Sequence, residues 1–242
     1  MKQPDEKELA RQRQGHRERL RERFLKESIS VLHSYEILEY LLCMLIPRRD
    51  VKPVAKALLD HFNSVSAVLD SSVAELEKFG LTHRVAADIV FLRQLITVYQ
   101  YEKVADRPFL ENSEAAVLYL QAKLGSSKKE TLMVFYLDSA RKIAGIWEHA
   151  GTVNCASIAP REVVERALLY HATGVILVHN HPSGVCIPSS EDIASTYSAY
   201  DALALLGICL QDHLIVSNTD TFSFVENGLL LQKPQGDSRH DN

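Results

Sequence analysis

The chain has 242 residues, of which 46% are hydrophobic and 24% are charged, and its formal net charge is −4. This length allows one large domain or two modest ones, and the apolar fraction is sufficient to bury a core. The net charge excludes a globally basic nucleic-acid binder, although residues 1–108 carry 18 basic against 16 acidic residues and the remainder carries 9 against 15. We expect no membrane contact, because no apolar run reaches the ~18 residues that a membrane span needs.

The cysteines and the first residues of the chain indicate a reducing compartment. None of the cysteines forms a C-x-x-C pair, so we expect neither a cysteine zinc site nor a disulfide framework. They are Cys43, Cys155, Cys186 and Cys209. The first residues are charged and lack the apolar segment of a signal peptide. A cytoplasmic protein is therefore expected.

The N-terminal part is predicted to be helical. Residues 1–15 are polar and expected to be flexible, and residues 16–27 are predicted to form a basic helix with Leu20 and Phe24 on one face. We expect its basic face to be solvated rather than bound to phosphates. Ser34 is expected to cap the next helix. Further helices are predicted over 54–62, 64–70, 72–78 and 84–103. These elements predict an all-helical domain over residues 16–103, followed by a linker over 104–112.

The second part of the chain mixes helices and strands. Helices are predicted over residues 113–124, 161–172 and 190–206. Strands are predicted over 131–137, 143–148, 152–158, 174–179, 208–216 and near 221–225. This mixture predicts an α/β sandwich with a mixed sheet over residues 113–232. The polar tail, residues 233–242, is expected to be disordered.

One motif, H-x-H-x7-S-x-x-D, stands at the end of the strand predicted over 174–179. Side chains alternate between the faces of a strand, so His179 and His181 point to one side and Asn180 to the other. A turn follows, and Ser189 with Asp192 three residues later is typical of a helix start. Two imidazoles and one carboxylate are a ligand set that leaves zinc one open position for water. The motif therefore predicts a zinc site.

These residues resemble the metal-binding motif of the JAMM (JAB1/MPN/Mov34) metalloproteases. The neighbouring motifs are similar to the bacterial RadC-like branch of that family, over roughly residues 110–230. They are Gly151-Thr152-Val153-Asn154, Pro160-Arg161-Glu162-Val163, Leu205-Leu206-Gly207-Ile208 and Asp212-His213. The resemblance implies an α+β chain with a helix-hairpin-helix-like N-terminal domain and a JAB/MPN-type sandwich.

The resemblance also implies a chemistry. One zinc ion per chain would be held by His179, His181 and Asp192, and Ser189 would stabilise the intermediate of peptide or isopeptide hydrolysis. A glutamate outside the motif, ahead of a buried strand, would serve as general base. We predict Glu130, which precedes the strand over 131–137. Glu148 and Glu162 are the alternatives, the latter at a helix start that favours acidic residues.

The ligand histidines need partners for their second ring nitrogens, and Asp212, Ser183 and backbone carbonyls are all candidates. The expected partner of the protein is a peptide or protein substrate. The alternative function is a non-catalytic DNA-repair-associated protein with a structural metal and DNA-binding N-terminal helices. A helix-hairpin-helix turn uses Gly-apolar-Gly, whereas Gly80-Leu81-Thr82 stands here. Because Thr82 hinders close backbone approach, only a weak DNA contact is expected. The oligomeric state and the substrate stay open.

Overall fold

The computed structural model describes residues 6–105, 113–150 and 159–230. The chain divides into two compact units, Met1–Leu95 and Ile96–Asn242. Helix α6 (His83–Ala105) begins in the first unit and ends in the second, so it continues past residue 103, and residues 106–112 lie outside the described ranges. In those ranges no helix has the length and apolar character that crossing a membrane requires.

The described part of the first unit is helical. Its elements before α6 are α1 (Glu6–Glu27), the 3-10 turn η1 (Ile29–Val31), α2 (Ser34–Leu45), α3 (Lys52–Phe62), α4 (Val65–Leu69) and α5 (Val73–Glu77). Apolar residues at helical spacing meet in one core, to which α2 contributes Leu38 and Leu42, and α3 contributes Ala55 and Leu58. The expected helical N-terminal part is therefore confirmed.

The starts of α1 and α2 differ from the prediction for identifiable reasons. Helix α1 begins at Glu6, not at residue 16, because residues 6–14 consist of strong helix formers. Helix α2 begins with Ser34 as its first helical residue, and His33 takes the N-cap position. The reason is Glu36, whose Oε2 accepts a hydrogen bond from His33 N at 3.0 Å. The acid at N3, rather than the serine, marks this helix start.

Part of the basic face of α1 is used inside the helical unit. The Arg17 guanidinium donates to the carbonyl oxygens of Ile46 at 3.2 Å and Arg49 at 2.5 Å. Arg23 Nη1 donates to Glu36 Oε1 at 2.7 Å. Two arginines of the face that we expected to be solvated thus bind acceptors of their own unit, and Arg23 remains exposed to solvent.

The turn between α5 and α6 contains Gly80 with φ at +77°. Two residues later, Thr82 Oγ1 accepts a hydrogen bond from Val85 N at 3.4 Å, at the start of α6. The residue that replaces a second glycine therefore helps to cap a helix. DNA contact through this turn stays a prediction.

The second unit is built around a sheet. Its elements after α6 are α7 (Ser113–Leu120), the π-helical η2 (Gln121–Gly125), β1 (Thr131–Leu137), β2 (Ile143–Ala150), α8 (Pro160–Leu169), β3 (Gly174–Asn180), α9 (Ser190–Ala204), β4 (Cys209–Val216) and β5 (Thr221–Ser223). The strand order is β2-β1-β3-β4-β5. Only β3 and β4 pair in parallel, and the other neighbours are antiparallel. The expected mixed sheet is confirmed.

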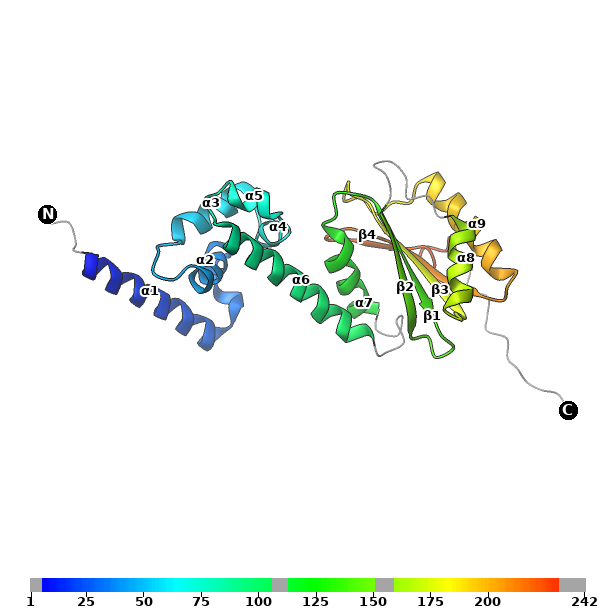
Figure 1. Cartoon of the computed structure of the whole chain (residues 1–242), viewed down its shortest axis with the longest axis horizontal. Helices are drawn as coiled ribbons and strands as arrows, with labels where there is room; N and C mark the ends of the chain where they lie inside the picture. The colour runs from blue at the N-terminus through cyan, green and yellow to red at the C-terminus, as the bar shows by residue number, and fades with distance from the viewer. Residues whose placement is uncertain (1–5, 106–112, 151–158, 231–242) are drawn as a thin grey trace. The chain divides into compact units, whose positions relative to one another are not determined.

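Helices cover both faces of this sheet, with α7 on one side and α8 and α9 on the other (Figure 1). The alternation of β1 divides its side chains between two cores. Leu132, Val134 and Tyr136 enter the core on the side of α8 and α9. Met133 and Phe135 enter the core on the side of α7.

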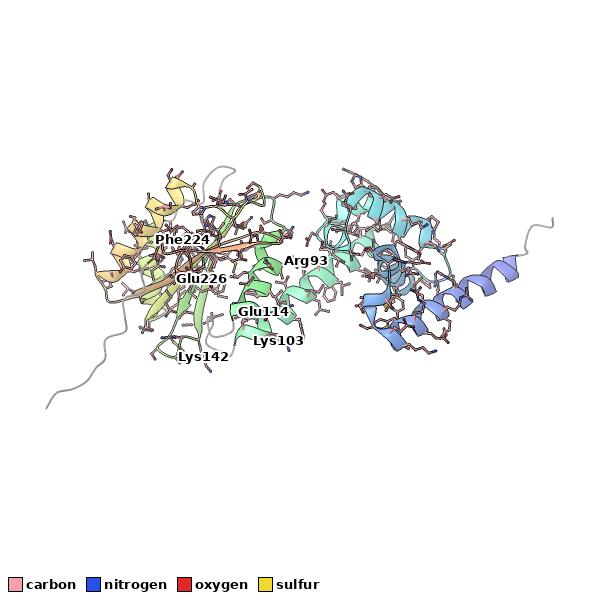
Figure 2. All side chains as sticks on the ribbon, turned by 180° about the vertical axis from the view of Figure 1, so that it is seen from behind. Arg93, Lys103, Glu114, Lys142, Phe224 and Glu226 are labelled. Atoms are coloured by element: carbon pink, nitrogen blue, oxygen red, sulfur yellow. The ribbon has the colours of Figure 1, made fainter. Side chains whose placement is uncertain are left out.

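The segment after β5 closes the first of these cores with Phe224 (Figure 2), which is fully buried. The strand expected over residues 152–158 and the tail over 233–242 lie outside the described residues. The helix expected over 113–124 ends as an α-helix at Leu120 and continues as the π-turn η2.

Gly145 on β2 is a site where packing leaves no room for a side chain. A Cβ built there would lie 2.5 Å from the ring of Tyr170. We predict that Gly145→Ala lowers the free energy of unfolding of the second unit by about 1–3 kcal/mol, as overpacking of a core does. Urea unfolding followed by the fluorescence of Trp147, the single tryptophan of the chain, measures this unit directly.

Gly174→Ala is the matched control on β3. A Cβ there would meet Gln211 Nε2 at 2.5 Å, which is the far end of a flexible side chain that can move away. This variant should lose less stability than Gly145→Ala. Equal losses would contradict the account of packing around Tyr170.

Candidate metal site

The site begins where β3 ends. His179 is 3% exposed and, like Leu132 beside it on β1, stands on the α8 and α9 side of the sheet. His181 follows two residues later, and the ring centroids of the two histidines are 4.8 Å apart. Alternation along the strand therefore places both imidazoles together, as predicted.

Asn180, between the histidines, faces the other way and holds a loop. Its Oδ1 accepts a hydrogen bond from Thr131 N at 2.9 Å. Its Nδ2 donates to the carbonyl oxygens of Ser127 at 3.2 Å and Lys129 at 3.1 Å. Asn180 is fully buried, and these contacts surround Glu130 in the chain. The residue between the two imidazoles thus positions the segment that carries Glu130.

Asp192 reaches the histidines because of the start of α9. Ser189 is the N-cap, and its Oγ accepts from Asp192 N at 3.1 Å, while Asp192 Oδ2 accepts from Ser189 N at 2.7 Å. This reciprocal pair is a capping box. It fixes the carboxylate so that Oδ1 lies 3.3 Å from His179 Nε2. The capping box that starts α9 is therefore also what positions the predicted ligand Asp192.

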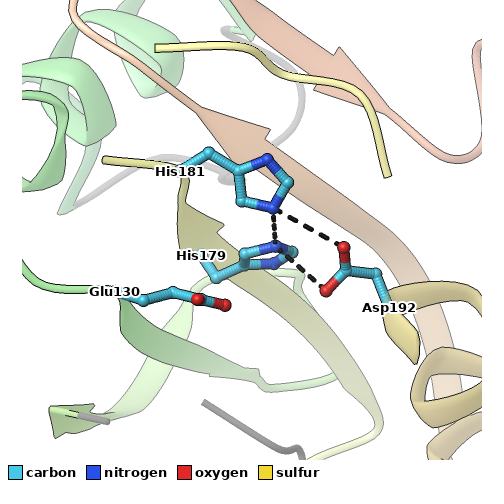
Figure 3. Close-up of side chains that lie close together, drawn as sticks. All are labelled: Glu130, His179, His181 and Asp192. Atoms are coloured by element: carbon cyan, nitrogen blue, oxygen red, sulfur yellow. Dashed lines mark hydrogen bonds and ion pairs between the residues drawn. The ribbon is translucent and has the colours of Figure 1, made fainter. Parts of the chain in front are cut away.

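The structure brings four of the predicted side chains together (Figure 3). One ligand atom from each of Glu130, His179, His181 and Asp192 lies within 4.8 Å of the other three. Figure 3 shows Glu130 approaching from the β1 side and Asp192 from the α9 side. Groups of the right chemistry thus converge from the segment before β1, the end of β3 and the start of α9.

The spacing of the three motif ligands fits a single metal ion. Bonds of 2.0–2.1 Å in tetrahedral geometry place two ligand atoms about 3.3 Å apart. The Nε2 atoms of His179 and His181 are 2.9 Å apart, and His181 Nε2 lies 3.5 Å from Asp192 Oδ2. The separation between His179 Nε2 and Asp192 Oδ1 is 3.3 Å. All three separations are close to that value, although the two histidines face different oxygens of the Asp192 carboxylate.

The protonation states of these groups also suit a metal. Burial lowers the pKa of His179 to about 4, so at neutral pH this imidazole is uncharged and offers a lone pair. Burial raises the pKa of Asp192, but hydrogen bonds with His181 and Ser189 outweigh burial and hold that pKa well below its usual range. The hydrogen bond with Asp192 raises the pKa of His181, so a metal must compete with a proton there.

The orienting partners of the histidines are not the side chains expected. His181 Nδ1 donates to the carbonyl oxygen of Val185 at 2.8 Å. Ser183 Oγ instead accepts from Val185 N at 3.3 Å and stabilises the turn. Asp212 accepts from Ser223 Oγ at 2.6 Å and from the backbone of His213 and Val225. Of the three kinds of partner considered, the backbone carbonyl is the one used, for His181.

The partner of His179 could not be recognised from the sequence. His213 Nε2 lies 2.8 Å from His179 Nδ1, and His213 Nδ1 lies 2.6 Å from Thr196 Oγ1. The Asp212-His213 pair contributed to the family resemblance, but nothing in its spacing assigned either residue a partner. The contact depends on the parallel pairing of β3 with β4, which no local pattern reveals.

The two alternative glutamates lie outside the four-residue group. Glu148 pairs with Met133 across β1 and β2, and its Oε2 lies 2.9 Å from Lys123 Nζ. It is therefore on the opposite face of the sheet from His179. Glu162 lies in the first turn of α8, 3.6 Å from Arg166. The thiol of Cys186 contacts the carbonyl oxygen of Asp220 at 3.4 Å and does not join the group.

Removing the amide of Asn180 should loosen the loop before β1. Asn180→Ala leaves the buried N–H of Thr131 without its partner, which costs about 1–3 kcal/mol. The two carbonyls that also lose their partner belong to part-buried contacts and can turn to water. We predict a loss of unfolding free energy in that range and faster hydrogen exchange of the Thr131 amide, measured by NMR. Ser127→Ala is the control, since it alters the same loop but leaves the Ser127 carbonyl in place. Equal exchange rates in both variants would contradict this role of Asn180.

Comparison with known proteins agrees with this architecture. Residues 110–229 match the family described as RadC-like JAB domain. A UPF0758 protein of Ruegeria pomeroyi is 39% identical over 217 residues, which cover 89% of this chain and 97% of the relative. A UPF0758 protein of Fusobacterium nucleatum is 34% identical over 226 residues, covering 90% and 97%. One of Rhodobacter capsulatus is 38% identical over 213 residues, covering 87% and 100%. The chain therefore belongs to the RadC-like family of JAB-domain proteins, with the JAMM/MPN fold.

Proposed function

We propose that this protein is a zinc-dependent hydrolase of JAMM type that cleaves a peptide or isopeptide bond. The observation that carries the proposal is the convergence of Glu130, His179, His181 and Asp192 within 4.8 Å. Three of these groups form a ligand set typical of catalytic zinc, and the fourth is a carboxylate beside them.

The motif residues would hold the ion. His179 offers a neutral imidazole nitrogen, His181 offers its Nε2 once the metal displaces the proton there, and Asp192 offers an ionised carboxylate oxygen. A zinc ion bound there supplies Lewis acidity, which lowers the pKa of a water molecule and polarises a carbonyl. Three protein ligands would leave such an ion able to take a reactant as well.

Glu130 is the side chain that we assign to proton transfer. It lies against the ligands without belonging to the motif, and the contacts of Asn180 fix the chain on both sides of it. In this role its carboxylate accepts the proton of the attacking water and returns it to the leaving amine. One carboxylate can perform both transfers if the attacking water and the leaving amine both lie beside its two oxygens.

Ser189 is assigned to the oxyanion that develops on the substrate carbonyl. Its hydroxyl lies 2.7 Å from Asp192 Oδ2, next to the ligand set. The same serine caps α9, so its substitution affects both the placement of Asp192 and any direct contact with the substrate.

Substituting Glu130 separates zinc binding from hydrolysis. We predict that Glu130→Gln retains one zinc per chain but loses about 10²–10⁴-fold in kcat, the usual contribution of a general acid–base group. Asp192→Asn, which keeps an oxygen for the helix cap, should lose both zinc and activity. Zinc is measured by elemental analysis, and hydrolysis with fluorescence-quenched peptides and a lysine-linked isopeptide.

Glu148→Gln is the matched control, since Glu148 lies on the opposite face and pairs with Lys123. It should keep both zinc and activity. Full activity of Glu130→Gln, or no cleavage of either substrate class by the zinc-loaded wild-type protein, would contradict the proposed function.

A further inference from the structure

His213 is a fully buried histidine directly behind the candidate metal site. It lies on β4, and its ring stacks on Phe224 with centroids 4.6 Å apart. Both ring nitrogens have polar partners, since Nε2 faces His179 Nδ1 at 2.8 Å and Nδ1 faces Thr196 Oγ1 at 2.6 Å. A buried imidazole with both nitrogens engaged has a defined tautomer, which the identity of its partners determines.

The direction of these hydrogen bonds follows from the contact that Thr196 makes with the backbone of Asp192. Thr196 Oγ1 lies 2.5 Å from the backbone carbonyl oxygen of Asp192, one turn earlier in α9. A carbonyl oxygen carries no proton, so the hydroxyl must donate to it. A hydroxyl has a single proton, and Thr196 Oγ1 therefore accepts from His213 Nδ1. This assigns the proton of His213 to Nδ1.

The position of the proton on His213 also determines the tautomer of the predicted ligand His179. His213 is fully buried and the partners of its two ring nitrogens are an imidazole and a hydroxyl, so an uncharged ring is favoured. With its proton on Nδ1, its Nε2 is unprotonated. His213 Nε2 must then accept, and His179 Nδ1 must donate. The remaining nitrogen, His179 Nε2, is left with its lone pair facing Asp192 Oδ1 at 3.3 Å and His181 Nε2 at 2.9 Å.

We propose that Thr196 and His213 are positioning residues that hold His179 in the tautomer needed to bind the metal. This inference rests on the proposed metal site and extends it to two residues that touch neither substrate nor metal. The hydrogen bonds run from the backbone carbonyl of Asp192 through Thr196 and His213 to His179. The free nitrogen of His179, Nε2, then lies 3.3 Å from the carboxylate of the same Asp192, where a metal would sit between them. These hydrogen bonds thereby tie the helix that supplies one ligand to the strand that supplies another.

The Nδ1 protons of the two predicted ligand histidines are thus held by different kinds of acceptor. His181 donates from Nδ1 to the carbonyl oxygen of Val185, which can only accept. His179 donates to a second imidazole, whose direction is in turn determined by Thr196. Because the imidazole of His213 can either donate or accept, the tautomer of His179 depends on the hydroxyl of Thr196. The tautomer of His181 does not depend on it.

The direct test is the tautomer of each histidine in the metal-free, full-length protein. Long-range ¹H–¹⁵N NMR spectra at neutral pH distinguish a proton on Nδ1 from one on Nε2. We expect His179 and His213 both to carry the proton on Nδ1. A wild-type protein in which His213 carries it on Nε2 would overturn the proposal.

The second test compares Thr196→Val with Thr196→Ser. Valine has nearly the shape of threonine but no hydroxyl, so the proton of His213 should move to Nε2, which forces His179 to accept at Nδ1 and protonates its Nε2. Zinc affinity, measured by competition with a chromogenic chelator, should then fall by about 10–100-fold, the usual cost of losing a partner of a metal ligand. Thr196→Ser should keep the wild-type affinity and tautomers. Wild-type affinity in Thr196→Val would overturn the proposal.

Neither readout involves hydrolysis. A protein that cleaves no amide but shows these tautomers would lose the proposed function and keep this inference. Conversely, hydrolysis with a proton on His213 Nε2 would keep the function and remove the inference. Since the wild-type spectra decide the question alone, a variant that fails to fold does not leave it open.

Discussion

The alternation of side chains at the end of β3 is the constraint on which the site depends. It sends His179 and His181 to one face of the sheet and Asn180 to the other. The histidines meet Asp192 on their face, while Asn180 binds the backbone at Ser127, Lys129 and Thr131 on its own. A shift of one residue in the register would exchange these roles and abolish the site. Three consecutive residues therefore organise both the ligands and the segment that carries Glu130.

Helix α9 provides the second half of the arrangement. Its capping box holds the carboxylate of Asp192 at the histidines, and Thr196, one turn later, contacts His213. A helix start is a fixed structure, because its unpaired N–H groups need acceptors. Because the predicted ligand Asp192 is the N3 residue of this capping box, the position of its carboxylate depends on helix geometry rather than on a loop. The site is thus built on a strand end and a helix end, both rigid elements.

Much of this site could be predicted from local patterns. Strand alternation predicted the direction of the histidines, the Ser-x-x-Asp pattern predicted the start of α9, and the strand after Glu130 was recognised from its apolar residues. His213 could not be found in this way, because its contact with His179 spans 34 positions and requires β4 to lie beside β3. The N-cap of α2, His33, was missed for a local reason, because Glu36 at N3 accepts from the backbone of His33 and so places the preferred cap residue, Ser34, inside the helix. Local chemistry is readable from sequence, whereas contacts between strands depend on topology.

The central claim is that two imidazoles and one carboxylate form a single zinc site. Zinc K-edge X-ray absorption of the zinc-loaded, full-length protein measures the ligands directly. The account predicts two imidazole nitrogens and oxygen ligands at about 2.0–2.2 Å, with no sulfur near 2.3 Å. A sulfur ligand, or a shell of oxygen atoms without imidazole, would contradict it.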